Sequence, residues 1–175
     1  MQVPEIREKE VAVFGTGTAG YTLAIFAKQM GASHVTVFGR SDHRIQKAVD
    51  LGADEGKLSP SAYTEDKKYD VVFEVTGNAR VFEKGLPFLK ENGILAVYGV
   101  STQPYQIDFG NTPDNFAFRR VTPAVKDAIA LAEGMLREGK IPVEKLLTHE
   151  WQFSEVKEAM QTVKAGDVIK GLVWF

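Results

Sequence analysis

A glycine-spaced turn is the first feature of the sequence whose residues could do chemistry. The pattern G-x-G-x-x-G runs through Gly15, Thr16, Gly17, Thr18, Ala19 and Gly20. An apolar run precedes it and a segment of helical period follows, which is the context of a turn that binds the pyrophosphate of a dinucleotide. There Gly15 would make the turn, Gly17 would admit the pyrophosphate to the backbone, and Gly20 would let helix pack against strand. The helix N-terminus would then face the phosphates with unpaired N–H groups. The alternative is a glycine-rich turn that binds nothing.

The end of the next apolar run indicates which dinucleotide would bind. An NAD site usually has Asp or Glu there, because a carboxylate hydrogen-bonds the ribose hydroxyls. This chain has Gly39, Arg40 and Ser41, and Arg44 follows one helical turn after Arg40. Glycine leaves room, the arginines supply positive charge and serine adds a hydroxyl, so the sequence predicts a site for the 2′-phosphate of NADP(H). The alternative for Arg40 is a solvated loop arginine. Domains that bind S-adenosylmethionine also usually carry a carboxylate at this strand end, so its absence argues against them.

The elements that must position these residues alternate along the chain. Short apolar runs predict strands, and longer segments of period 3.6 predict helices, a pattern typical of a parallel α/β sheet. We expect strands over 11–14, 34–38, 70–77, 94–100 and 116–120, with helices over 19–30, 41–51 and 78–90. The strand over 116–120 should lie at an edge of the sheet. The fold class is therefore α/β, a doubly wound parallel sheet of the Rossmann type.

Finer features of these elements can also be predicted. The first helix should bury Leu23, Phe26, Ala27 and Met30 on one face. Ser41 should cap the second helix, Pro87 should break the third and Gly93 should end it. The polar segment 54–70 should be irregular and exposed. The loop 102–115 should hold one short strand at 105–109.

The last third of the chain changes in character. Thr122 and Pro123 are a good helix start, and Val125, Ile129, Ala132 and Leu136 share one helical face. A strand over 145–151, a helix over 154–163 and a strand over 168–175 should follow. We therefore divide the chain into a cofactor-binding Rossmann domain, 1–120, and a small C-terminal α+β lobe, 121–175.

Composition excludes several classes of function. The 175 residues suit one domain with an appendage, and the net charge of −2 argues against nucleic-acid binding. No apolar run approaches the ~18 residues of a membrane span, and the charged N-terminus has no signal-peptide core, so we expect a cytoplasmic protein that does not bind a membrane. The absence of cysteine removes disulfides, thiol nucleophiles and thiolate zinc ligands.

No catalytic residue and no metal ligand is predicted in this chain. The three histidines, His34, His43 and His149, are scattered and show no metal-ligand spacing. We expect His34 and His43 to be solvated and His149 to be structural. No nucleophile and base are paired, since "GVSTQ" does not fit the G-x-S-x-G pattern.

Longer stretches carry a resemblance to a known family. The segment 11–55, then "YDVVFEVTGN" at 69–78, then "LPFLKENGILAVYGV" at 86–100, resembles the medium-chain dehydrogenase/reductase superfamily, the zinc-type alcohol dehydrogenases in particular. The ending, 146–175, is similar to the C-terminus of those enzymes. Because the motifs occur in order over nearly the whole chain, they are more specific than the glycine pattern alone.

The resemblance implies further cofactor contacts. Val75, Thr76 and Gly77 would lie beside the adenosine or ribose. The backbone of Tyr98, Gly99 and Val100 would receive the nicotinamide carboxamide. Lys170 stands where the family often has an arginine that reaches the phosphates, and Gly39-Arg40 stands where NAD-specific members have their acidic residue.

The resemblance also implies a missing part. Family members begin with a mostly β catalytic domain that supplies the zinc ligands, the proton relay and most of the substrate pocket, whereas this chain begins just before the first cofactor-domain strand. We therefore expect the NADP(H)-binding portion of an alcohol dehydrogenase-like oxidoreductase, with hydride transfer between an alcohol or carbonyl substrate and the nicotinamide. Zinc would bind only in the N-terminal domain, and this chain alone should be inactive. The alternative is a stand-alone NADP(H)-binding regulatory or assembly module, although such a module would have little reason to keep the C-terminal lobe.

Two apolar features predict a homodimer. Phe116 and Phe118 share one face of the expected edge strand, and in dimeric relatives two such edges pair across a twofold axis. The tail also exposes apolar side chains, Trp174 and Phe175 included. The alternative is a monomer in which the tail folds back on its own sheet and the loop 101–114 covers the edge strand.

Overall fold

The structure is a computed structural model that describes residues 5–59, 67–122, 126–166 and 168–175. The chain divides into two compact units, residues 1–124 and 125–175. Each unit is described by itself. The functional assignment of the two parts on either side of residue 120 stays a prediction. None of the described helices is long and apolar enough to cross a membrane.

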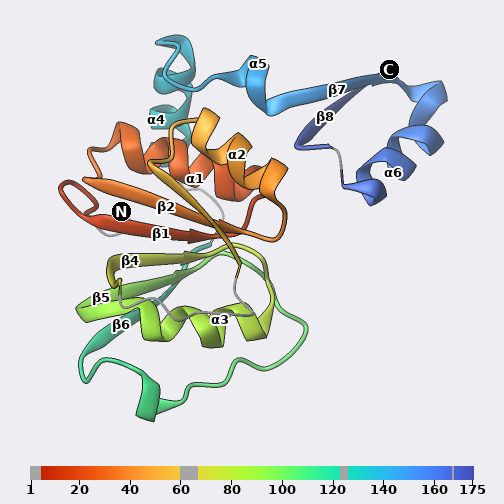
Figure 1. The fold of residues 1–175 in the computed structure, drawn as a ribbon. Helices are drawn as coiled ribbons and strands as arrows, with labels where there is room; N and C mark the ends of the chain where they lie inside the picture. The colour runs from red at the N-terminus through yellow and green to blue at the C-terminus, as the bar shows by residue number, and fades with distance from the viewer. Residues whose placement is uncertain (1–4, 60–66, 123–125, 167) are drawn as a thin grey trace. The chain divides into compact units, whose positions relative to one another are not determined.

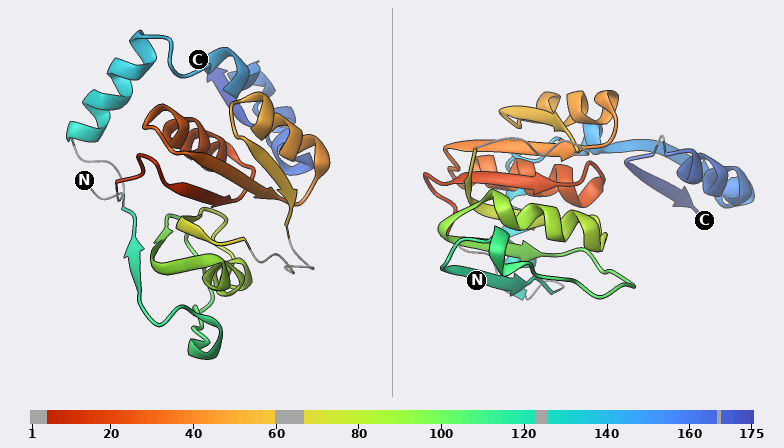
Figure 2. Two further views of the ribbon diagram at one scale, coloured as in Figure 1. Left: turned by 60° about the vertical axis from the view of Figure 1, so that its left-hand side comes forward. Right: turned by 60° about the horizontal axis from the view of Figure 1, so that its bottom comes forward.

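The first unit is a six-stranded sheet with helices on its faces (Figure 1). In chain order its elements are β1 (Glu10–Phe14), α1 (Thr18–Gln29), β2 (His34–Gly39), α2 (Asp42–Asp50), β3 (Glu55–Leu58), β4 (Tyr69–Glu74), α3 (Ala79–Gly85), β5 (Leu89–Val97) and β6 (Phe116–Arg120). The strand order is β3-β2-β1-β4-β5-β6, and every neighbouring pair is parallel. Figure 2 shows α1 and α2 on one side of the sheet and α3 on the other. The predicted doubly wound parallel sheet is confirmed.

The central strands form because they are almost continuously apolar, as strands buried on both faces must be. Residues Val11–Phe14 of β1 are all buried, and so are Val35–Gly39 of β2. Phe14 pairs with Phe38 of β2 on one side and with Glu74 of β4 on the other, and Glu74 pairs with Val97 of β5. The carboxyl ends of these four strands are therefore level, and the turns that follow them lie at one edge of the sheet.

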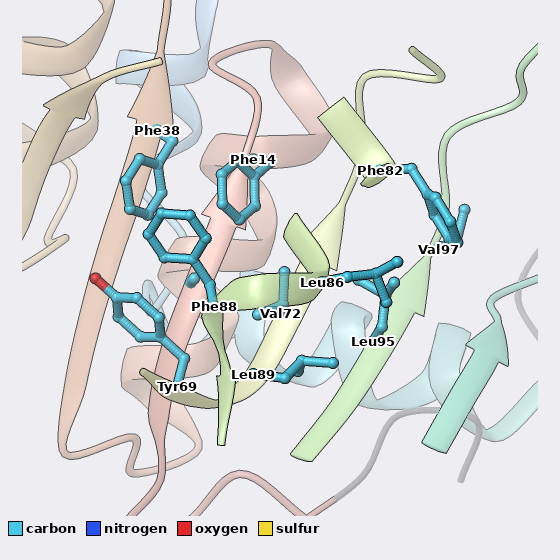
Figure 3. Packing of buried hydrophobic residues seen from close by; sticks show 11 residues of the cluster. Phe14, Phe38, Tyr69, Val72, Phe82, Leu86, Phe88, Leu89, Leu95 and Val97 are labelled. Atoms are coloured by element: carbon cyan, nitrogen blue, oxygen red, sulfur yellow. The ribbon is translucent and has the colours of Figure 1, made fainter. Parts of the chain in front are cut away.

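A cluster of aromatic and aliphatic side chains fills the space between the sheet and α3 (Figure 3). The rings of Phe14 and Phe38 stack with centroids 4.5 Å apart, and Phe88 meets both edge-on at 5.8 and 5.6 Å. Such pairs contribute about 0.5–1.5 kcal/mol each beyond their buried area. The predicted break at Pro87 is confirmed, because α3 ends at Gly85 and a short 3₁₀ turn, Leu86–Phe88, leads into β5.

The buried face of α1 differs from the predicted one. Only Ala27 of the four expected residues is buried; Leu23, Phe26 and Met30 are half-buried. The buried residues are Gly20, Tyr21, Ala24, Ile25 and Ala27. The apolar residues of α1 are spread around the whole helix, so its hydrophobic period did not define one buried face. Small side chains let it approach the sheet, and they decide which face is buried.

Three other local predictions were wrong. The segment 54–70 is not wholly irregular, because it contains β3, which pairs with β2. Gly93 does not end a helix; it lies inside β5, which begins four residues earlier. The described residues 101–115 contain no strand, and only a 3₁₀ turn, Phe109–Asn111, forms there.

The described residues of the second unit form a two-stranded parallel sheet, three α-helices and a 3₁₀ turn, Phe153–Glu155. Its elements are α4 (Lys126–Arg137), α5 (Val143–Leu146), β7 (Leu147–Gln152), α6 (Val156–Ala165) and β8 (Lys170–Trp174). Gly166 ends α6 with a φ of +92°, the left-handed conformation that favours glycine after a helix. The predicted helix start at Pro123 and the apolar residue Val125 lie outside the described residues.

Candidate functional site

The glycine turn between β1 and α1 is closely packed at both ends. Gly15 has a φ of +132°, and a β-carbon there would lie 2.8 Å from Cγ2 of Val75 and 3.1 Å from Cγ2 of Thr76. A β-carbon on Gly20 would overlap the carbonyl oxygen of Gly15. Gly15 thus brings the chain against the turn after β4, and Gly20 lets α1 begin directly behind the turn. Both positions have the tight packing that the motif requires.

Gly17, between them, faces open space. It is the N-cap residue of α1, and no atom of the described residues outside its chain neighbours lies within 4 Å of its β-carbon position. The first turn of α1 contains no acidic residue. An open approach to backbone N–H groups at the positive end of a helix dipole suits an anion such as pyrophosphate. The turn therefore fits a dinucleotide, although phosphate binding itself stays a prediction.

Arg44 of α2 braces this turn. Its Nη1 donates a hydrogen bond to the carbonyl oxygen of Thr16 over 3.1 Å, and Thr16 is buried. The hydroxyl of Tyr21 in α1 donates to the carbonyl oxygen of Arg44 at 2.9 Å. Burial raises the pKa of Tyr21, and the nearby positive charge of Arg44 opposes this shift only in part. The phenol therefore stays a neutral donor that ties α1 to α2.

The residues at the end of β2 have two different environments. Gly39 is buried, and a β-carbon there would lie 2.5 Å from Cγ2 of Thr16 and 2.9 Å from Cγ1 of Ile45. Glycine at this position is thus required by the packing of the turn against α2. Arg40 and Ser41 are exposed, and within the described residues Arg40 has no hydrogen bond or ion pair. Ser41 is the N-cap residue of α2, but its side chain makes no capping hydrogen bond.

The turns after β4 and β5 form the opposite side of the same sheet edge. The strands end earlier than predicted, so Val75–Gly77 and Tyr98–Val100 belong to turns. Gly77 has a φ of +69°, and a β-carbon there would lie 2.5 Å from the carbonyl oxygen of Val100. Thr76, Tyr98 and Val100 are exposed, with 47% of Tyr98 and 75% of Val100 accessible. The two turns touch each other and leave these side chains open to a ligand.

The sequence reasoning missed Glu74, which lies under both turns. Its side chain is 1% exposed. The carboxylate Oε1 accepts hydrogen bonds from the backbone N–H of Thr76 at 2.6 Å, from the Thr76 hydroxyl, and from the backbone N–H of Gly77 at 3.0 Å. An acidic residue directly after the buried apolar run Val71–Phe73 was the available signal, because a buried charge needs partners.

The structure brings most of the predicted cofactor residues to one edge of the sheet. The turns after β1, β2, β4 and β5 all lie at the carboxyl ends of parallel strands, and the strand order reverses between β1 and β4. Ligands of open α/β sheets bind in the crevice at such a reversal. Lys170, the first residue of β8, is exposed and belongs to the second unit, so its predicted cofactor contact remains a prediction.

The histidines have ordinary structural surroundings. His34 is half-buried rather than fully solvated: 32% of its side chain is exposed, but its Nε2 atom is buried and lies 3.5 Å from Oε2 of Glu55. His43 is exposed. His149 stacks on Trp151 with ring centroids 5.1 Å apart, and its Nδ1 lies 3.0 Å from the Thr148 hydroxyl. The described part of the chain contains no group of three or more His, Cys, Asp or Glu residues that could hold a metal ion.

The opposite, amino-terminal edge of the sheet carries a network of ion pairs. Lys90 lies 2.7 Å from Glu10 and 3.0 Å from Asp70, and Lys28 lies 2.8 Å from Asp54. Asp70 also accepts the backbone N–H of Glu10 at 2.8 Å. Burial raises the pKa of Asp70, but the hydrogen bonds from Glu10 and Lys90 outweigh it and hold that pKa below its ordinary value. This network stabilises the sheet at the end away from the crevice.

Comparison with known proteins identifies the family of this site. The family model described as zinc-binding dehydrogenase matches residues 19–123, which include most of the predicted cofactor residues. The chain belongs to the zinc-binding dehydrogenase family. The resemblance to the zinc-type alcohol dehydrogenases of the medium-chain superfamily is thereby confirmed.

Curated relatives of this zinc-binding dehydrogenase chain are dehydrogenases of about twice its length. A sorbitol dehydrogenase of Halalkalibacterium halodurans is 30% identical over 178 residues, which cover 93% of this chain and 51% of that protein. An L-threonine 3-dehydrogenase of Bacillus licheniformis is 25% identical, over 90% of this chain and 49% of that protein. The chain spans about half the length of the curated relatives it matches.

Solved structures share the fold of this family member. A zinc-binding dehydrogenase of Clostridium scindens, described as putative, superposes with a TM-score of 0.87 at 20% identity, over 99% of this chain and 52% of that one. L-idonate 5-dehydrogenase of Escherichia coli superposes with a TM-score of 0.86 at 22% identity, over 99% of this chain and 52% of that one. At these identities the likeness shows the fold alone.

Proposed function

We propose that this chain is the NADP(H)-binding portion of an alcohol dehydrogenase-like oxidoreductase, which transfers a hydride between an alcohol or carbonyl substrate and the nicotinamide. The observation that carries the proposal is the exposed Arg40 at the carboxyl end of β2, beside the glycine turn. When bound, NADP⁺ accepts the hydride and NADPH supplies it. The residues of this chain bind and orient that cofactor.

The environment of Arg40 supports a 2′-phosphate. The end of β2 carries no carboxylate, and the first acidic residue after it, Asp42, is exposed in the first turn of α2. Within the described residues no acidic partner holds the guanidinium of Arg40, so its planar set of donors is available for a phosphate. The Ser41 hydroxyl, which makes no capping bond, is a second donor. A charge-assisted hydrogen bond of this kind contributes about 1.5–3 kcal/mol.

The remaining contacts follow the crevice from one strand end to the next. The open backbone at Gly17 would hold the pyrophosphate, the turn of Val75 and Thr76 would contact the adenosine or ribose, and the turn of Tyr98–Val100 would receive the carboxamide. The close packing of Gly15 against Val75 and of Gly77 against Val100 supports this order, because it makes the three turns one continuous wall.

The zinc ligands and most of the substrate pocket would come from the half of the relatives that this chain does not match. Hydride transfer needs a substrate oxygen that is polarised and held against the nicotinamide. We therefore expect the 175-residue chain to bind NADP(H) and, by itself, not to oxidise alcohols. Sustained alcohol oxidation by the repurified chain would contradict this part of the proposal.

The test is titration calorimetry of the purified chain with NADPH and NADH. NADPH should bind more tightly, and Arg40→Ala should shrink the difference by about 1.5–3 kcal/mol, or about tenfold to a hundredfold in affinity. Arg40→Lys should retain part of the preference, because it keeps the positive charge but loses the planar guanidinium with its paired N–H donors. Arg119→Ala is the matched control, since it removes an exposed arginine from the edge strand β6. An unchanged preference in Arg40→Ala, or no dinucleotide binding by the unmodified chain, contradicts the proposal.

A further inference from the structure

Glu74 is the only acidic side chain that is buried among the described residues. It ends β4 at the point where the strand order reverses. A buried carboxylate costs several kcal/mol of desolvation unless hydrogen bonds compensate it. Within the described residues its carboxylate accepts hydrogen bonds from Thr76 and Gly77. The carboxylate therefore shapes the turn Val75–Gly77, here named the β4 turn.

Oε1 of Glu74 accepts hydrogen bonds from three donors in the β4 turn. They are the backbone N–H groups of Thr76 and Gly77, at 2.6 and 3.0 Å, and the Thr76 hydroxyl. Oε2 accepts the Gly77 N–H more weakly at 3.3 Å. Bonds to an ionised acceptor are about twice as strong as neutral ones. The negative charge therefore fixes the positions of two backbone N–H groups and one hydroxyl.

The backbone of Glu74 holds the next turn as well. Its carbonyl oxygen accepts the N–H groups of Tyr98 and Gly99 at 2.9 and 3.1 Å. A β-carbon on Gly99 would lie 2.5 Å from Oε2 of Glu74 and would overlap the backbone nitrogen of Gly77. One residue thus touches both turns that follow β4 and β5, through its carbonyl group and through its carboxylate.

The β4 turn is also in contact with the glycine turn on its other side. The methyl groups of Val75 and Thr76 occupy the space that a β-carbon of Gly15 would need. A shift of the β4 turn would therefore move it against Gly15 or away from it. The three turns can keep their spacing only while the β4 turn keeps one conformation.

We propose that Glu74 is a positioning residue, whose ionised carboxylate holds the β4 turn in the conformation that shapes the dinucleotide crevice before the cofactor binds. This inference deepens the proposed function and rests on it. Glu74 itself is covered and does not touch the ligand. It acts by keeping the fraction of binding-competent molecules near one, since apparent affinity falls in proportion to that fraction.

The experiment compares two variants of the same strand. Glu74→Gln keeps the shape of the side chain, but it removes the charge and places an NH₂ donor beside the Gly77 N–H. We expect it to weaken NADPH and NADH binding by the same factor, about five- to tenfold. The control, Val72→Ala, removes methyl groups from the buried cluster and should lower the Tm, with both dissociation constants unchanged within about twofold.

The outcomes separate this inference from the proposed function. Equal weakening for both dinucleotides in Glu74→Gln, with the NADPH preference intact, supports the role of Glu74. A lower Tm without a change in either dissociation constant shows a merely structural role and overturns it. Loss of the preference in Arg40→Ala tests the proposed function alone. If the unmodified chain binds neither dinucleotide, the proposed function fails and the role of Glu74 fails with it.

A second pair of variants keeps the inference testable if Glu74→Gln does not fold. Thr76 is exposed, so changes there should preserve the fold. Thr76→Val removes the hydroxyl that donates to Glu74, whereas Thr76→Ser keeps it. Without any dinucleotide present, we expect faster amide hydrogen exchange at Gly77 in Thr76→Val than in Thr76→Ser, because only serine keeps the hydroxyl that donates to Glu74. Equal behaviour of the two variants would contradict the inference.

Discussion

The guanidinium of Arg44 donates a hydrogen bond from Nη1 to the carbonyl oxygen of Thr16 over 3.1 Å. These residues lie 28 positions apart, so a side chain of α2 holds the turn that begins α1. The sequence had placed Arg44 beside Arg40 as a second positive charge for a 2′-phosphate. In the structure, part of its donor capacity supports the glycine turn, whereas Arg40 remains open.

The two arginines should therefore respond differently to substitution. Arg44→Met should weaken NADPH and NADH binding together, by about tenfold, because it removes a charged hydrogen bond from the turn that both cofactors use. Gln46→Met, on the exposed face of α2, is the control and should change neither. Calorimetric titration measures the effect. A loss confined to NADPH would instead assign Arg44 to the 2′-phosphate.

Substitutions of two glycines in the turn should distinguish a loss of cofactor binding from a loss of stability. Gly17 is extended, with a φ of −103°, and its β-carbon position is open, so Gly17→Ala should fold with an unchanged Tm. The variant should lose affinity for both dinucleotides by tenfold or more, because the added methyl group would obstruct about one charge-assisted hydrogen bond to the pyrophosphate. A β-carbon at Gly20 would overlap the Gly15 carbonyl, so Gly20→Ala should lower the Tm by several degrees or prevent folding. Thermal unfolding and titration of both variants test this. Normal binding by Gly17→Ala would show that the turn does not hold a pyrophosphate.

The ion pairs at the amino-terminal edge predict an acid-sensitive stability. Burial raises the pKa of Asp54 and of Asp70, but hydrogen bonds and charges from neighbours outweigh it, so both pKa values lie below the ordinary 3.8. The unfolded chain then binds more protons around that pH. The contribution to stability is complete above the ordinary pKa, and it is lost as the pH falls through the lower folded pKa.

Asp70→Asn should remove part of this pH dependence. Because the side chains of Asp70 and Lys90 are partly exposed, the loss at neutral pH should be only about 1 kcal/mol. Urea unfolding at about pH 7 and about pH 3 should show a smaller difference between the two conditions for the variant than for the unmodified chain. If the free energy of unfolding fell by the same amount between the two pH values in both proteins, Asp70 would be excluded as a source of the acid sensitivity.

A homodimer through β6 is our proposal for assembly. This strand is the last in the described sheet order, and 48% of Phe118 is exposed, while Phe116 packs on the buried cluster. Sedimentation at micromolar concentration should give twice the chain mass of 19.3 kDa. Phe118→Lys should shift the chain to the monomer, and Trp174→Lys in β8 should not. A monomer of the unmodified chain would refute the pairing, and dissociation by Trp174→Lys alone would assign the interface to the tail.

The sequence by itself determined five of the six strands of the first unit, its three α-helices and the glycine turn between β1 and α1. These features are encoded locally, by apolar runs, helical period and glycine spacing. It also determined the family, because several motifs occur in the right order. The short strand β3 was missed because only half-buried residues form it, and its pairing with β2 supplies what its composition does not.

The tertiary structure decided which of the residues meet. Glu74 reads as an acid that follows the apolar run Val71–Phe73, and only the register of β4 and β5 brings the turn after β5 onto it. Arg44 looks like a surface charge until α2 is placed against the glycine turn. The buried face of α1 was likewise set by the contact between Gly20 and Gly15, not by hydrophobic period. The contacts of Arg44 with the glycine turn and of Glu74 with the turn after β5 join residues far apart in sequence, so no local pattern encodes them. They form only when the parallel sheet aligns its strand ends.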